Sequence, residues 1–106
     1  MVERYNIQTG RWAHSPYMKK ARVHHSCCFL GMGLYVFCGR NDEGMLSCIE
    51  MLNIVKDITE ADDRKWVLIH KRWNSYYNQG LRSRAKALVI ALSKTEILIA
   101  GGYGGC

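Results

Sequence analysis

Short runs of apolar residues, separated by polar or glycine-rich turns, follow one another along the whole chain. Runs of about four to eight residues that are rich in β-branched and aromatic side chains predict strands. They occupy residues 2–7, 24–30, 34–38, 47–54, 65–70, 86–92 and 97–100, with a shorter run at 11–13. The longest is less than half of the roughly 20 residues that a membrane-spanning helix needs. The pattern therefore predicts an all-β fold without a transmembrane segment.

The sequence contains two copies of this pattern. The second copy follows the first by 47 residues at a glutamate, 54 at a tryptophan, 62 at an arginine and 63 at a closing glycine. The spacing grows only between these landmarks, and insertions are best tolerated in loops. A period near fifty residues with four short strands per copy is typical of β-propeller blades. The landmarks are Glu3, Tyr5, Trp12, Arg22 and Gly39, then Glu50, Trp66, Arg84, Gly101 and Gly102.

The order apolar-Glu-x-(Tyr/Leu), Trp, Arg, apolar run, Gly-Gly resembles the kelch repeat over nearly the whole chain. Pro16 and Met18 before the arginine fit this resemblance, whereas Cys38 in place of the first glycine and Leu52 in place of the second tyrosine depart from it. The resemblance implies a partial kelch-type β-propeller. Residues 22–70 would form one complete four-stranded antiparallel blade, flanked by an outer half blade (1–21) and by a loop plus an inner half blade (71–106).

The landmarks are best interpreted as structural, because residues that recur with the fold seldom carry chemistry. We expect Gly101 and Gly102 to end an inner strand where a side chain would collide or need an unfavourable φ. We expect Trp12 and Trp66 to be buried between adjacent blades. The remaining charged landmarks should make recurring hydrogen bonds or ion pairs: Glu3, Glu50, Arg22 and Arg84.

One cluster, residues 24–28, combines histidines and cysteines. In a strand His25 and Cys27 share one face and His24 and Cys28 the other, so neither face offers the three or four ligands of a zinc site. Phosphate-binding, nucleophile-elbow and zinc-protease motifs are absent from the sequence. We therefore expect no metal, no cofactor and no enzyme activity. The odd number of cysteines, five, favours reduced thiols in the cytosol or the nucleus.

The formal net charge is +6, and basic residues gather around aromatic ones between residues 71 and 86. This could form a nucleic-acid surface, but a solvated inter-blade loop is the favoured interpretation. Protein binding is more credible, since Tyr, Trp and Arg most often anchor interfaces. The predicted topology brings segments 14–21, 40–44 and 73–82 to one rim, with the acidic loop 57–63 on the opposite face. The candidate contacts are Arg40, Asn41, Trp73, Tyr76, Tyr77 and Arg82.

The resemblance implies a protein-interaction module that binds partner proteins through inter-blade loops. Two alternatives stay open: a fragment of a galactose-oxidase-like or sugar-isomerising propeller enzyme, and a truncated fragment without function. A propeller closes with about four to eight blades, and this chain makes at most two. We therefore expect either missing blades in a longer parent or head-to-tail self-association, in which about three or four copies would complete a ring.

Overall fold

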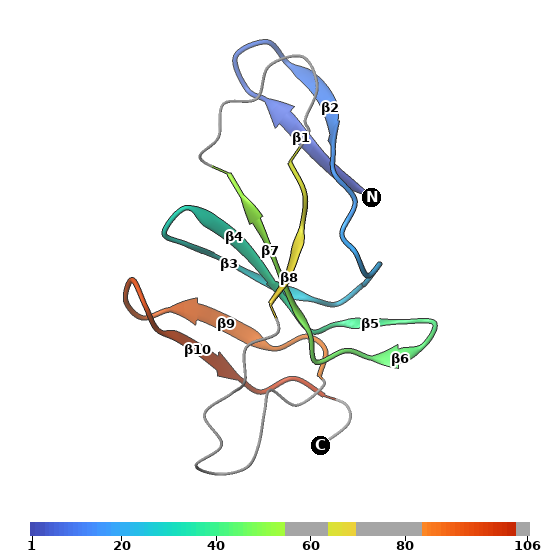
Figure 1. Ribbon diagram of the computed structural model, residues 1–106, viewed down its shortest axis with the longest axis vertical. Helices are drawn as coiled ribbons and strands as arrows, with labels where there is room; N and C mark the ends of the chain where they lie inside the picture. Colours follow the sequence, from blue (N-terminus) through green and yellow to red (C-terminus); the bar gives the residue numbers. More distant parts are fainter. Residues whose placement is uncertain (55–63, 70–83, 104–106) are drawn as a thin grey trace.

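A four-stranded antiparallel sheet lies at the centre of the molecule, in the order β3-β4-β7-β8 (Figure 1). The computed structural model describes residues 1–54, 64–69 and 84–103. The strands of this sheet are β3 (Ser26–Leu30), β4 (Gly33–Phe37), β7 (Ile49–Asn53) and β8 (Val67–Ile69). They correspond to the predicted strand segments 24–30, 34–38, 47–54 and 65–70, and the all-β prediction is confirmed for the described residues. Among these residues, no helix is long and apolar enough to cross a membrane.

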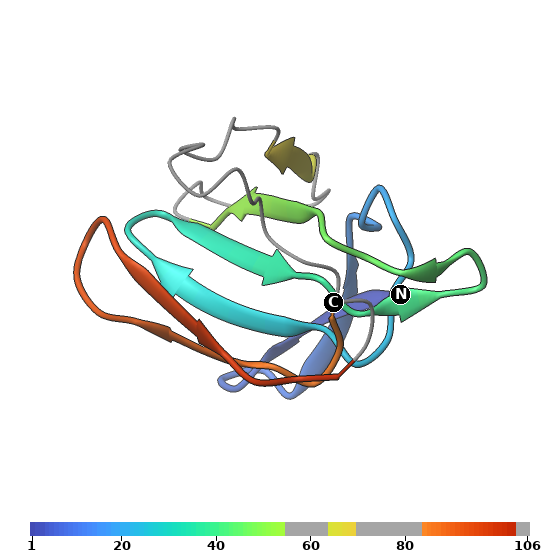
Figure 2. The same cartoon turned by 90° about the horizontal axis from the view of Figure 1, so that it is seen from below.

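Two antiparallel strand pairs flank the central sheet. The first pair is β1 (Val2–Asn6) with β2 (Arg11–Ser15), and the second is β9 (Leu88–Ala91) with β10 (Ile97–Ala100). They lie on opposite sides of the sheet in Figure 1, and Figure 2 shows β9–β10 running beside β3. A third pair, β5 (Arg40–Asn41) with β6 (Gly44–Met45), projects as a small hairpin from segment 40–44, for which the sequence predicts a loop.

The internal repeat is visible in the pairing of the strands. In the first copy Val2 pairs with Ser15 and Arg4 with Ala13; in the second Ile49 pairs with Ile69 and Met51 with Val67. These partners are related by the offsets of 47 and 54 residues that the sequence landmarks give. The β3–β4 and β9–β10 pairs also have equivalent registers. Tyr35 lies opposite Cys28, and Leu98 lies opposite Ile90, at the landmark offsets of 63 and 62 residues. Both copies therefore share one strand register.

An apolar cluster covers each face of the central sheet. Val36, Leu52 and Trp66 are buried on one face, where Val2 and Met18 pack against them. Phe37, Cys38 and Ile49 are buried on the other, together with residues of β9 and β10. Because β-strand side chains alternate between faces, the neighbours Val36 and Phe37 belong to different clusters. The sheet is therefore packed between the two flanking pairs.

The prediction that both tryptophans are buried is confirmed for Trp66 and wrong for Trp12. Trp66 is 2% exposed, and its indole Nε1–H donates to the carbonyl of Pro16 at 2.8 Å. Trp12 is 67% exposed and stacks at a tilt on Tyr5, at a ring-centroid distance of 4.8 Å. Trp66 is covered by residues of the preceding copy, whereas no described segment lies over Trp12 in the equivalent way.

Several strands are shorter than predicted because the backbone turns left-handed at their ends. His24 and Lys86, which precede β3 and β9, have φ of 57° and 58°, and Cys38, after β4, has φ of 59°. Residues other than glycine rarely adopt a positive φ. A histidine, lysine or cysteine in the sequence therefore does not indicate a left-handed turn. In the hairpin between β3 and β4, Gly31 has φ of 59°, whereas Gly33 belongs to β4 and lacks a positive φ.

The glycine that closes each copy is required by its surroundings. Gly39 has φ of 90°, and a Cβ there would lie 2.7 Å from the carbonyl oxygen of Val23. Its counterpart Gly102 has φ of 87°, and a Cβ would lie 2.8 Å from the carbonyl oxygen of Ala85. Gly101 has φ of 72° with open space around it. The prediction of collision or unfavourable φ is therefore confirmed for Gly101 and Gly102.

Candidate protein-binding site

A buried ion pair organises the segment that leads into the central sheet. The guanidinium of Arg22 and the carboxylate of Glu50 are both 0% exposed, with Nη2 and Oε2 separated by 2.5 Å. The carboxylate also accepts hydrogen bonds from the backbone N–H groups of Lys19 and Lys20, at 2.6 and 3.1 Å. Three donors thus converge on one carboxylate, which satisfies the need of a buried charge for partners. This arrangement fixes residues 19–22.

The same arginine ties three segments together. Its Nη1 donates to the carbonyls of Cys38 and Cys48 at 3.0 and 3.1 Å. In the second copy, Arg84 Nη1 donates to the carbonyl of Gly101, the counterpart of Cys38, at 3.2 Å. The prediction of a recurring hydrogen bond is therefore confirmed for Arg22 and Arg84, and Glu50 forms an ion pair with Arg22. Glu3, by contrast, is exposed.

The hairpin β5–β6 holds the first two predicted contacts. Arg40 and Val23 exchange two backbone hydrogen bonds of 2.9 Å, so the base of the hairpin is anchored while the Arg40 side chain stays exposed. The amide of Asn41 donates to the carbonyl of Ala21 at 3.0 Å, and its Oδ1 accepts from the backbone N–H of Glu43 at 2.9 Å. Asn41 therefore joins the tip of the hairpin to segment 14–21.

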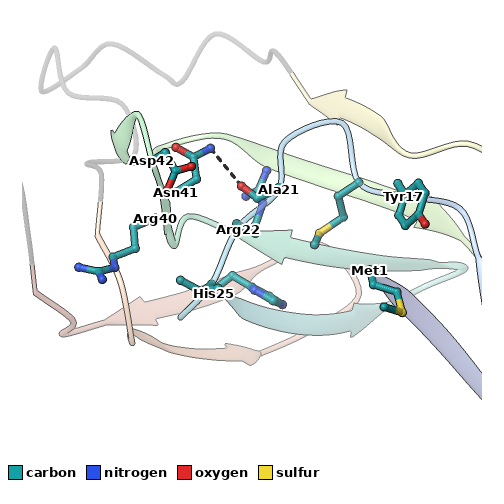
Figure 3. Close-up of a pocket in the computed structure, with 10 residues that line it drawn as sticks. Met1, Tyr17, Ala21, Arg22, His25, Arg40, Asn41 and Asp42 are labelled. Carbon is teal, nitrogen blue, oxygen red and sulfur yellow. Dashed lines mark hydrogen bonds between the residues drawn. The ribbon is translucent and has the colours of Figure 1, made fainter.

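An open hollow of about 680 Å³ lies between this hairpin and segment 14–21, and we call it the rim hollow (Figure 3). In Figure 3 the Arg40 guanidinium extends away from the other labelled side chains, whereas Asn41 points toward Ala21. A second hollow adjoins it on the side of Lys19, Lys20 and Glu43. The residues that line the rim hollow are Met1, Tyr17, Met18, Ala21, Arg22, Val23, His25, Arg40, Asn41 and Asp42.

Two titratable groups near the rim hollow are shifted toward their neutral forms. Partial burial lowers the pKa of His25, and the positive charge of Arg22 lowers it further. Burial raises the pKa of Cys38, against the opposing influence of the nearby Arg84. His25 is therefore a neutral hydrogen-bonding group at neutral pH, and the Cys38 thiol is a poor nucleophile because the thiolate is the reactive form.

The structure brings together two of the three segments that the sequence assigns to one rim. Segments 14–21 and 40–44 meet through Asn41 and Ala21. Four predicted contacts lie outside the described residues: Trp73, Tyr76, Tyr77 and Arg82. The acidic loop 57–63 lies outside them as well. Sequence reasoning missed Tyr17, His25 and Asp42 as members of the rim hollow, although Tyr17 and Asp42 stand inside the loops that it places there.

The histidine and cysteine cluster does not assemble a ligand set. Because His24 adopts a positive φ, the strand alternation expected for residues 24–28 begins only at Ser26. His24 Nδ1 instead lies 3.4 Å from the hydroxyl of Tyr103. Within the described part of the chain, no three His, Cys, Asp or Glu side chains are grouped so that they could hold a metal ion. The four cysteines described there, at positions 27, 28, 38 and 48, are free thiols.

No protein-family model and no solved structure matches this chain.

Proposed function

We propose that this chain is a protein-interaction module that binds a partner protein at the rim hollow, through the β5–β6 hairpin and segment 14–21. The observation that carries the proposal is the Asn41–Ala21 hydrogen bond, at 3.0 Å, because it holds two separate loop segments as one continuous surface. Loops fixed on a rigid sheet commonly carry binding function. The hairpin projects from the body of the molecule, where a partner can reach it (Figures 1 and 2).

The chemistry of this surface suits a polar peptide segment with acidic groups. Arg40 supplies an exposed guanidinium, which can form two parallel hydrogen bonds to a carboxylate. Tyr17, which is 72% exposed, offers an aromatic face on the same hollow. Arginine and tyrosine are enriched among the residues that dominate binding energy. The ion pair of Arg22 and Glu50 contributes indirectly, because it holds the backbone of Lys19 and Lys20 in place.

Site-specific photocrosslinking identifies the partner. A photoreactive phenylalanine analogue replaces Tyr17 in one variant and Leu92 in a control, since Leu92 is 61% exposed near the opposite β9–β10 tip. We expect one protein to be crosslinked through position 17 and not through position 92.

The affinity of the purified partner is then measured by calorimetry. Arg40→Glu should weaken binding at least about tenfold, whereas Lys94→Glu, the same charge reversal in the β9–β10 turn, should leave it unchanged. Circular dichroism should show the same fold in both variants, because both side chains are exposed. Unaltered affinity in Arg40→Glu, or equal losses in the two variants, would contradict the proposed site.

A further inference from the structure

The central sheet consists of two strand pairs, β3–β4 and β7–β8, which are joined by the pairing of β4 with β7. Its register places Leu34 opposite Leu52 and Val36 opposite Glu50. By the repeat, β10 is the counterpart of β4 and β1 is the counterpart of β7. Yet β10 pairs only with β9 and β1 only with β2 in the described structure. Among the described residues, β10 and β1 thus each have an open edge, and their counterparts β4 and β7 pair with each other in the central sheet.

We propose that β10 of one molecule pairs with β1 of a second copy of this chain, and so forms a four-stranded sheet β9-β10-β1-β2 across the two molecules. The two strands cannot meet within one molecule as folded, because β1–β2 and β9–β10 lie on opposite sides of the central sheet (Figure 1). Open strand edges readily accept strands of another chain. The proposal concerns a surface separate from the rim hollow and does not depend on the proposed function.

The repeat specifies the register of this contact. Transferring the β4–β7 pairing by the landmark offsets places Ile97 opposite the second copy's Tyr5, Leu98 opposite Arg4, and Ile99 opposite Glu3. A shift by one residue would turn each side chain to the other face of the sheet, so register is strongly specified when a face is buried. The predicted pairing can therefore be tested at single residues.

Charge complementarity supports the same contact. Glu50 is fully buried against Arg22, whereas Glu3, at the equivalent position of the first copy, is exposed. The counterpart of Arg22 is Arg84, which already donates to Gly101 as Arg22 donates to Cys38. When β10 and β1 pair, Arg84 of one molecule reaches Glu3 of the other in the way that Arg22 reaches Glu50. Arg84 keeps its intramolecular hydrogen bond, as Arg22 does.

The apolar residues of β1 and β2 fit this arrangement. Tyr5 and Trp12 are 48% and 67% exposed, whereas their counterparts Leu52 and Trp66 are 3% and 2% exposed. Directly opposed residues point to the same face of a sheet, and Ile97 packs against the central sheet of its own molecule. Paired with β10, the β1–β2 strands therefore turn Tyr5 and Trp12 toward the central sheet of the molecule that supplies β10. Their apolar face would then be covered. Contiguous apolar surface of this kind is commonly an interaction site.

The mass of the purified chain, measured by light scattering across a dilution series, tests the contact. Wild-type chain should have the mass of two or more copies at micromolar concentration and dissociate on dilution. Glu3→Arg places a like charge opposite Arg84, and it should raise the dissociation midpoint at least about tenfold. Glu43→Arg is the matched control, because it makes the same change at an exposed residue of the β5–β6 turn. Single-chain mass for the wild type, or equal midpoints for the two variants, would overturn the proposal.

Crosslinking tests the register separately. Chains carrying Arg4→Cys are mixed with chains carrying Leu98→Cys, treated with a short bismaleimide and analysed by peptide mass spectrometry. We expect a link between positions 4 and 98, since directly opposed Cβ atoms lie about 4.5–5.5 Å apart. When Ser93→Cys, in the β9–β10 turn, replaces Leu98→Cys, we expect no link between positions 4 and 93. Equal yields for positions 98 and 93 would show that association does not use the proposed strand pairing.

Discussion

Replacement of Glu50 by glutamine tests whether the buried ion pair stabilises the central sheet. The substitution keeps the size of the side chain but removes its charge, and it leaves the guanidinium of Arg22 fully buried without a counterion. Removing one partner of a buried pair costs about 3–5 kcal/mol. The new amide group also presents N–H donors to the donors of Arg22, Lys19 and Lys20. We expect a loss at the upper part of this range.

Urea unfolding followed by circular dichroism measures the effect, with the free energy of unfolding extrapolated at constant slope. A loss of this size is a large share of the roughly 5–15 kcal/mol that holds a typical domain together. Glu43→Gln, the same substitution at an exposed position, should change stability by less than about 0.5 kcal/mol. A loss below about 1 kcal/mol for Glu50→Gln, well under the cost of breaking a buried pair, would refute the interpretation that this carboxylate organises the fold.

A double variant separates the ion pair from the backbone contacts. Arg22→Met with Glu50→Leu removes both charges together, a change that is often neutral for a simple buried pair. Here Lys19 and Lys20 would still lose the acceptor for their backbone N–H groups, which costs about 1–3 kcal/mol for each group left buried. We therefore expect the double variant to remain less stable than wild type. Full recovery would show that these N–H groups find other acceptors.

Three further predictions concern the core, the repeat glycine and pH. Trp66→Ala should lower the free energy of unfolding by about 3–5 kcal/mol in urea titrations, because the indole is 2% exposed. In thermal unfolding, Gly39→Ala should cost at least about 3 kcal/mol and Gly31→Ala about 1–2 kcal/mol, since both have positive φ but only the former meets a neighbouring backbone atom; similar costs would argue against steric crowding at Gly39. The folded-state pKa of His25 lies below the unfolded value of about 6.5, so the unfolded chain binds more protons below that pH. Stability should therefore fall as pH decreases from about 7 toward 5, and His25→Asn should flatten this part of the urea-midpoint profile.

The strand pattern and the repeat could be predicted from the sequence because each rests on local signals. Alternation and turn residues locate β1 to β4 and β7 to β10, and the recurring glutamate and arginine indicate the pair that Glu50 and Arg22 form. The left-handed turns at His24 and Lys86 carry no glycine that would reveal them. Trp12 and Trp66 share one landmark position, and only the tertiary neighbours of Trp66 make it buried.

The rim hollow could be predicted only in part. Topology indicates that segments 14–21 and 40–44 adjoin, and the structure places Asn41 against Ala21. The short pairing of β5 with β6 escapes prediction because each strand has only two residues. From the sequence, His25 is considered only as a metal ligand and not as a residue that lines this hollow. Its position depends on the backbone turn at His24 and not on strand alternation.

The presence of an apolar cluster on each face of the central sheet has a consequence for how the molecule opens. Within the described part of the chain, each flanking strand pair packs against a neighbour on one side, whereas β4 and β7 do so on both sides. In arrays of repeats, local stability follows the number of packed neighbours. At dilutions where copies of the chain are dissociated, backbone amides of β4 and β7 should therefore exchange with solvent deuterium last, and those of β1–β2 and β9–β10 first. The two ends of the array can then open independently while the sheet between them remains folded.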